Sequence, residues 1–206
     1  MKKISSYKIT FIALSGVINL IGGTIALTLR LPIYLDSLGT MMTAALLGPV
    51  YGMIPGAISA VISGCTTDVY AFYYLPVQLI TGTMTGLACR LFQPGTLKRS
   101  WKLFPASLLI SLPGTVVSSF ITASVFGGIT SSGSTILVQL LHGAGVSLTA
   151  SVFLVQVFTD YMDRLLSLGA VMLLLAAIPP TMKFRIKKGT SSVQDVPSFH
   201  GGINGS

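Results

Sequence analysis

The sequence is poor in charge and contains no glutamate. Its five acidic residues are all aspartates, and charged residues of both signs make up only 9% of the 206 positions. Soluble domains carry about 25% charged residues, whereas 51% of this chain is hydrophobic. A bilayer core of about 30 Å needs roughly 20 apolar residues per helix, and the sequence holds several such stretches. The composition therefore predicts an all-α integral membrane protein.

The common catalytic signatures are also missing. A HExxH-type metal site is excluded because there is no glutamate, and the two histidines, His142 and His200, lie far apart in the sequence. No Walker A motif and no GxSxG motif occur. Cys65 and Cys89 lie in apolar runs and form no CxxC pair, so they predict neither a metal site nor a disulfide. We therefore expect no catalytic residues, no cofactor and no enzymatic activity in this chain.

Basic residues are concentrated in three clusters. One precedes the first apolar run, one lies in the connector at residues 90–102, and one follows the last apolar run. Their members are Lys2, Lys3 and Lys8, then Arg90, Lys98, Arg99 and Lys102, then Lys183, Arg185, Lys187 and Lys188. Cytoplasmic loops carry an excess of lysine and arginine, so both termini and the connector are predicted to be cytoplasmic, in a bacterial cell membrane. The predicted topology thus accounts for the basic residues and the net charge of +8. Because the charge needs no further explanation, we do not expect a nucleic-acid partner.

The apolar runs predict six spanning helices. They cover residues 8–29, 37–47, 51–65, 75–92, 103–126 and 165–182. Residues 134–160 are interpreted as two short helices that turn at residues 142–145 and form a re-entrant or lid hairpin in the fifth loop. A seventh span there would put the last basic cluster outside, so six spans are favoured over seven. Residues 1–188 then form a single transmembrane substrate-binding domain, and residues 189–206 a flexible cytoplasmic tail.

Polar and aromatic side chains gather in the predicted outer loops. They are Tyr34, Asp36, Asp68, Tyr70, Tyr73, Tyr74 and Gln78. Aromatic walls with a few polar groups are typical of small-molecule pockets, although tyrosines also anchor helices at membrane interfaces. Asp36 either caps the second helix or contacts a ligand, whereas Asp68 has no evident capping role and is predicted to be functional. His142 is a further candidate contact, with a purely structural histidine as the commoner alternative.

The ionisable residues map to the predicted outer ends of helices. Secondary transporters that couple to protons or sodium usually need a carboxylate near the bilayer midplane. Asp36, Asp68, Asp160, Asp163 and Arg164 all lie away from the predicted midplane. This weakens a stand-alone secondary transporter, which remains the main alternative function. An intramembrane enzyme is a remote alternative.

Two segments carry a resemblance to a known family. Residues 31–40 read LPIYLDSLGT, and residues 44–52 read AALLGPVYG, which is a short helix–Gly-Pro–helix unit. Together with the length and the basic fourth connector, they make residues 8–188 resemble the S components of energy-coupling factor (ECF) transporters. Such a subunit binds a vitamin in an outward pocket made by the first, third and fifth loops and the outer ends of helices four to six.

The resemblance also implies partners. An S component works with a transmembrane coupling subunit and two cytoplasmic ATPases, so ATP hydrolysis is expected in those partners. Family members dock through small residues of the first helix, usually an Ala-x-x-x-Ala. The corresponding region here contains Ala13 and Gly16, with Val17 in place of the second alanine, and Gly22 and Ala26 supply a second small-residue face. Cobalamin is the favoured vitamin, and pyridoxine, pantothenate or a thiamine precursor are nearly as plausible.

Overall fold

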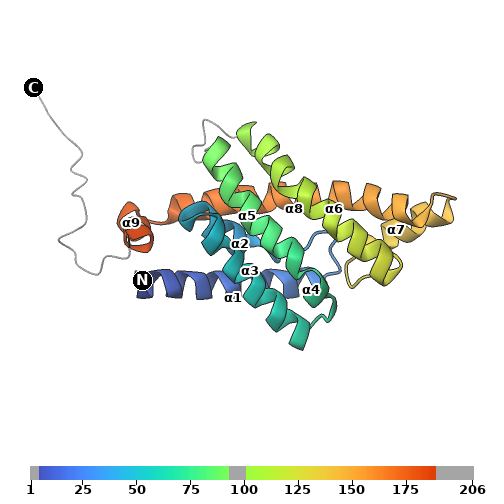
Figure 1. The fold of residues 1–206 in the computed structure, drawn as a ribbon, viewed down its shortest axis with the longest axis horizontal. Helices are drawn as coiled ribbons and strands as arrows, with labels where there is room; N and C mark the ends of the chain where they lie inside the picture. The colour runs from blue at the N-terminus through green and yellow to red at the C-terminus, as the bar shows by residue number, and fades with distance from the viewer. Residues whose placement is uncertain (1–4, 93–100, 189–206) are drawn as a thin grey trace, which may run out of the picture.

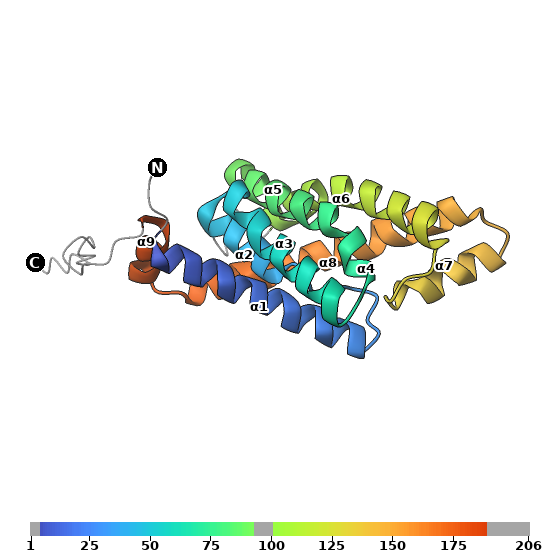
Figure 2. The ribbon, with the colours of Figure 1, turned by 60° about the horizontal axis from the view of Figure 1, so that its bottom comes forward.

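The described part of the chain is a helical bundle. The computed structural model describes residues 5–92 and 101–188, and no strand occurs among them. The helices are α1 (Ser6–Thr28), α2 (Leu38–Leu47), α3 (Pro49–Thr66), α4 (Tyr70–Tyr73), α5 (Leu75–Phe92), α6 (Leu103–Phe126), α7 (Ser134–Gly143), α8 (Leu148–Ala177) and α9 (Pro180–Lys188). This confirms the all-α prediction. Figures 1 and 2 show an elongated bundle, with the N-terminal end of α1 beside α9 at one end and α7 at the other.

Three of these helices are long and apolar enough to cross a membrane. They are α1, α3 and α6, and α8 with α9 forms a bent pair that would add a fourth. Helix α2 has only 10 residues, which corresponds to a rise of about 15 Å and half of a bilayer core. The structure therefore supports a membrane-embedded protein, and six spans remain a prediction. The predicted tail at residues 189–206 lies outside the described residues.

Proline and glycine set the boundary between α2 and α3. Helix α2 ends at Gly48, whose φ of 97° suits a residue without a Cβ atom. Pro49 then occupies the first turn of α3, where its missing N–H costs nothing. The two helices fold back on each other, and both pack against α5. The Gly-Pro motif of the sequence thus lies at the junction of the expected helix–Gly-Pro–helix unit.

A buried asparagine joins the first three helices. Asn19 of α1 donates from Nδ2 to Thr40 Oγ1 at 2.8 Å and to Ser59 Oγ at 3.2 Å. Its Oδ1 accepts from the backbone nitrogens of Gly39 at 2.7 Å and Thr40 at 3.2 Å. Asn19 therefore satisfies two of the free N–H groups at the start of α2. We call Asn19, Gly39, Thr40 and Ser59 the Asn19 node.

The short helix α2 lies in the middle of the bundle. It packs against α1, α3, α5, α8 and α9, and most of its residues are buried, with Met41 fully so. Met41 belongs to an apolar core with Ile110 of α6 and Leu168 and Val171 of α8. A helix with buried residues on every side needs partners all round. The fold supplies them by wrapping the longer helices around α2.

The region after residue 133 differs from the prediction at both ends of its last long helix. The helix predicted at 165–182 is interrupted after Ala177, and α9 is bent by 106° relative to α8. The first arm of the expected hairpin is present as α7, and the chain turns near residue 145 as expected. The second arm does not end at Asp160, because α8 continues without a break from Leu148 to Ala177. The charged residues at 160–164 had suggested a helix boundary. Asp163 and Arg164 are instead buried on the inner face of α8, where they form an ion pair.

Most of the small residues expected to dock a partner are used within the chain. A Cβ atom on Gly22 would overlap the carbonyl of Leu35, and one on Gly16 would lie 3.9 Å from the carbonyl oxygen of Pro55. Ala26 is also buried. Ala13 and Val17 remain exposed on the outer face of α1. Of the five residues expected to dock a partner, three are therefore buried within the chain, and Ala13 and Val17 are exposed.

Candidate functional site

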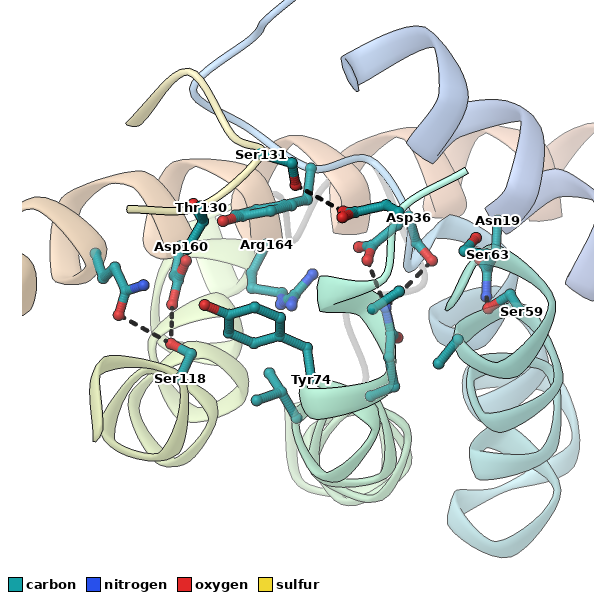
Figure 3. Close-up of a pocket in the computed structure, with 17 residues that line it drawn as sticks. Asn19, Asp36, Ser59, Ser63, Tyr74, Ser118, Thr130, Ser131, Asp160 and Arg164 are labelled. Carbon is teal, nitrogen blue, oxygen red and sulfur yellow. Dashed lines mark hydrogen bonds between the residues drawn. The ribbon is translucent and has the colours of Figure 1, made fainter. Parts of the chain in front are cut away.

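A cavity opens where three loops meet α5, α6 and α8. Its lining comes from residues 34–36, 68–74 and 130–131, and from α5, α6 and α8, with α1 and α3 closing one side (Figure 3). The centre of a water molecule can reach about 70 Å³ of it. Since one water needs roughly 10–15 Å³ on this scale, the cavity has room for a few waters or a compact ring. Five of the eight predicted binding residues line it, namely Tyr34, Asp36, Asp68, Tyr74 and Gln78.

The first loop is held in a strained conformation by α8. Leu35 has a φ of 51°, in the left-handed region that a branched side chain rarely adopts. Its N–H donates to Asp163 Oδ1 at 3.1 Å, and Arg164 Nη1 donates to Ser37 Oγ. These contacts place Tyr34 and Asp36 on either side of an anchored residue. Both side chains then reach the cavity.

Asp36 contacts a glutamine and does not cap α2. Gln78 Nε2 donates to Asp36 Oδ2 at 2.7 Å, while the first N–H groups of α2 are satisfied by Asn19. Burial raises the pKa of Asp36 to about 6, against the opposing effect of Arg164 and of the Gln78 hydrogen bond. Of the two roles that the sequence left open for Asp36, capping is therefore excluded.

Asp68 joins two loops across the cavity. Its Oδ2 accepts from Ser131 Oγ at 2.6 Å, and its Oδ1 accepts from the backbone nitrogen of Tyr70 at 3.2 Å. The second bond is an Asx turn that leads into α4, a local role that the sequence did not suggest. The first bond ties the α6–α7 loop to the α3–α4 loop. Asp68 therefore shapes the cavity as well as lining it.

The three tyrosines of the third loop have different positions. Tyr74 lines the cavity, and its hydroxyl lies 2.5 Å from Thr122 Oγ1. Burial raises the pKa of Tyr74 above its usual value, and it raises that of Tyr34 to about 12. Tyr70 and Tyr73 do not line the cavity, but stack edge-to-face on Phe126 with ring centroids 4.7 and 5.0 Å away. Tyr73 is half exposed, as an interfacial anchor would be.

His142 lies away from the cavity. It is exposed at the end of α7, and its Nδ1 forms a 2.9 Å hydrogen bond with the carbonyl oxygen of Val146. This bond stabilises the α7–α8 turn. The structural alternative raised for His142 therefore accounts for its position.

Several residues that line the cavity were not among the predicted binding residues, because their signal in the sequence is weak. Asp160 Oδ2 accepts from Thr115 at 2.9 Å and from Ser118 at 3.2 Å, and Gln156 Nε2 donates to Thr122 Oγ1 at 2.8 Å. The i, i+4 spacing of Gln156, Asp160 and Arg164 places them on one face of a helix. That spacing was the available signal, and the assumed break at Asp160 concealed it.

The chain matches no protein-family model, no curated protein and no solved structure. What the cavity can do must therefore be argued from its chemistry. Within the described residues, no three His, Cys, Asp or Glu side chains are placed to hold a metal ion together. The lining offers aromatic rings, carboxylates, amides and hydroxyls around a small space, a combination suited to binding a small polar molecule.

Proposed function

We propose that this chain is the substrate-binding subunit of an ECF-type vitamin importer in a bacterial cell membrane. One observation carries the proposal: the first, third and fifth loops meet at one cavity with Gln78 of α5, Ser118 of α6 and Gln156 of α8. That is the pocket architecture implied by the resemblance at residues 31–52. The sequence does not bring these loops together, since residues 36 and 160 are more than 120 positions apart.

The size of the cavity favours a small vitamin. A space of about 70 Å³ for water centres suits a compact molecule built from one or two small heteroaromatic rings. The corrin macrocycle of cobalamin is several times larger than such a ring, so cobalamin would require the loops to separate. We therefore place pyridoxine-like and thiamine-like molecules ahead of cobalamin as ligands.

Direct binding tests the proposal. The full chain, purified in lipid nanodiscs, is titrated calorimetrically with thiamine, pyridoxine, pyridoxamine, riboflavin, nicotinamide, biotin, pantothenate and cobalamin. We expect one of them to bind with a dissociation constant well below 1 µM, which corresponds to more than about 8 kcal/mol. The chain alone in liposomes should show no concentrative uptake, because the proposed ATPase partners are absent. If none of the vitamins binds, the proposal is wrong.

A stand-alone secondary transporter is the second candidate. The observation that favours it is the position of Asp160 and Asp163, which lie inside α8 and not at a helix end. Carboxylates within a span are typical of proton-coupled carriers. Liposomes with the chain alone and an imposed pH gradient separate the two functions. Uptake above the external concentration would favour the carrier, and binding without uptake the S component.

Labelling tests the proposed orientation. In Figures 1 and 2 the start of α1, the end of α5 and α9 lie in the same half of the molecule, which fits basic residues on one side of a membrane. In a variant without Cys65 and Cys89, a cysteine at position 131 should react with an impermeant maleimide from outside intact cells. A cysteine at position 192 should react only after lysis. The reverse pattern would overturn the orientation.

A further inference from the structure

The charge at the cavity is opposite to that of the chain. The protein has a formal charge of +8 and only five acidic residues. Asp36, Asp68 and Asp160 line the cavity, and Asp163 adjoins it through its bond to the first loop. Arg164 is the one basic residue in the lining. Four of the five acidic residues thus lie at or beside the cavity, whose lining contains a single basic residue.

The guanidinium group of Arg164 is already paired. Arg164 Nη1 donates to Asp163 Oδ2 at 2.7 Å, and both side chains are buried. No other ion pair within 4 Å is found in the described residues. Neutral groups therefore provide the hydrogen bonds to the carboxylates that line the cavity: Gln78 for Asp36, Ser131 for Asp68, and two hydroxyls for Asp160. Carboxylates in a poorly hydrated site are costly unless an opposite charge compensates them.

A second observation is an acceptor that the chain leaves unsatisfied. Gln78 lines the cavity and is only 5% exposed, and its Oε1 has no hydrogen-bond partner. The amide cannot be reversed to satisfy it without losing the 2.7 Å bond from Nε2 to Asp36. Unpaired buried acceptors are uncommon in native proteins. This one adds a further acceptor to a lining that already contains three carboxyl groups.

Aromatic rings complete the site. Tyr34 and Tyr74 line the cavity, and Figure 3 shows the Tyr74 ring on its wall. A tyrosine ring attracts a cation that lies over its face. The carboxylates are too dispersed to hold one metal ion together, but they can meet an extended molecule at several points. Acceptors, carboxylates and aromatic faces around a small space are complementary to an organic cation.

We propose that the cavity binds a small organic cation, such as a protonated aromatic amine or an N-alkylated heteroaromatic ring. The inference rests on the proposed function and narrows it to positively charged vitamins. The cation lies between the carboxylates of Asp36 and Asp160, with Tyr34 and Tyr74 against its ring. Anionic vitamins such as biotin and pantothenate are rejected, because Arg164 is already neutralised by Asp163.

Two vitamers provide a test that needs no variant. Pyridoxamine and pyridoxine have nearly the same shape, but pyridoxamine carries an ammonium group where pyridoxine has a hydroxyl. The full chain in nanodiscs is titrated with both at pH 7.5, and with thiamine, riboflavin, biotin and pantothenate. We expect the tightest ligand to be a cation, thiamine or pyridoxamine, and pyridoxamine to bind at least about tenfold tighter than pyridoxine, since hydrogen bonds to charged groups are the stronger ones.

The outcomes separate this inference from the proposed function. If a neutral or anionic vitamin is the tightest ligand, the inference is overturned and the vitamin-binding function stands. If none of the six binds, both are overturned for these ligands. A cationic best ligand supports both.

Variants then locate the charge that the cation meets. Asp36→Asn and Asp160→Asn keep the side-chain shape, and each should lower the affinity for the cationic ligand by about tenfold or more. They should change the affinity for the neutral pyridoxine much less. Tyr73→Phe, outside the cavity, is the matched control and should bind like the parent. Equal loss for cationic and neutral ligands, or no loss for either, would show that these carboxylates do not select a cation.

Discussion

Two buried polar regions meet at the cavity, whose wall includes Asn19 and Ser59, and their hydrogen bonding differs. At the Asn19 node, the amide makes four hydrogen bonds to Gly39, Thr40 and Ser59. Elsewhere on the cavity wall, Gln78 makes its side-chain bond from Nε2 to Asp36 and leaves Oε1 unpaired. One amide is saturated by the fold and the other is not. A satisfied polar cluster rigidifies and specifies a fold, whereas unpaired groups around a space are what a ligand can complete.

The largest expected effect comes from breaking the Asn19 node. In Gly39→Ala, the new Cβ atom would overlap the carbonyl of Ser15, so α1 and α2 must separate and the Asn19–Gly39 bond is lost. Overpacking costs about 1–3 kcal/mol, and an unpaired buried N–H costs about 1–3 kcal/mol more. We expect a loss of about 3 kcal/mol or more in the free energy of unfolding, measured by thermal and denaturant unfolding in micelles.

Gly169→Ala is the matched control for that substitution. Gly169 lies inside α8, and nothing is within 4 Å of a Cβ atom placed on it. Alanine is favoured over glycine in a helix interior by about 0.5–1 kcal/mol, so this variant should be as stable as the parent or slightly more. A Gly39→Ala protein as stable as Gly169→Ala would contradict the proposed close contact between α1 and α2.

The next effect sharpens the comparison at the cavity. Tyr74→Ala removes an aromatic wall and the hydroxyl contact with Thr122. It should weaken the cognate vitamin about tenfold or more, which corresponds to about 1.4 kcal/mol. Tyr73→Ala removes a half-exposed ring outside the cavity and should leave the affinity unchanged. Equal affinities for the two variants would move the binding site elsewhere.

A smaller effect concerns pH. Burial raises the pKa of Asp36 to about 6, from 3.8 in the absence of perturbation. The folded protein therefore holds a proton that the unfolded chain has released, and the contribution of Asp36 to stability falls as pH rises from about 4 to about 6. Arg164 and Asp163 on α8 and Gln78 on α5 act on this carboxyl. Asp36→Asn should make the free energy of unfolding less dependent on pH between about 4 and 6. The variant should also be more stable than the parent at pH 7.

The measurement for this prediction is the difference in melting temperature between parent and Asp36→Asn from pH 4 to pH 8. Using the difference removes the contributions of the other carboxyl groups, provided they titrate alike in both proteins. A constant difference across the range would show that Asp36 has the same pKa in the folded and unfolded chain.

The smallest effect tests the contact between two loops. Ser131→Ala removes the 2.6 Å bond to Asp68 that joins the fifth loop to the third. A neutral-to-charged hydrogen bond at a partly exposed site contributes about 1–2 kcal/mol, so the bound vitamin should dissociate several-fold faster with little change in folding. Thr66→Ala is the control, because Thr66 Oγ1 bonds only the backbone of its own helix, at Ile62. Equal dissociation rates in the two variants would show that the contact does not retain the ligand.

The sequence was sufficient for most helix positions. Apolar runs with glycine and proline at their ends placed α1, α2, α3, α5, α6 and α7 within about two residues, because the backbone must satisfy its own hydrogen bonds in an apolar environment. The Gly-Pro pair at 48–49 marks the α2–α3 turn for a stereochemical reason that no tertiary contact is needed to see. Cavity residues such as Asp36 and Tyr74 could also be predicted from the sequence, because polar groups in short loops between apolar runs are easily recognised.

Tertiary structure decided what the charged segment at 160–164 does. Local pattern suggests a helix end there, since charges are costly inside an apolar helix. Asp163 and Arg164 are tolerated because they pair with each other and hold the first loop, more than 120 residues away. Contacts between distant residues also determine that Asn19 accepts hydrogen bonds from the first N–H groups of α2 and that Gln78 Oε1 has no partner. They also bring three loops together at one cavity. These features depend on which side chains meet across helices, and a pattern along one chain contains no such pairing information.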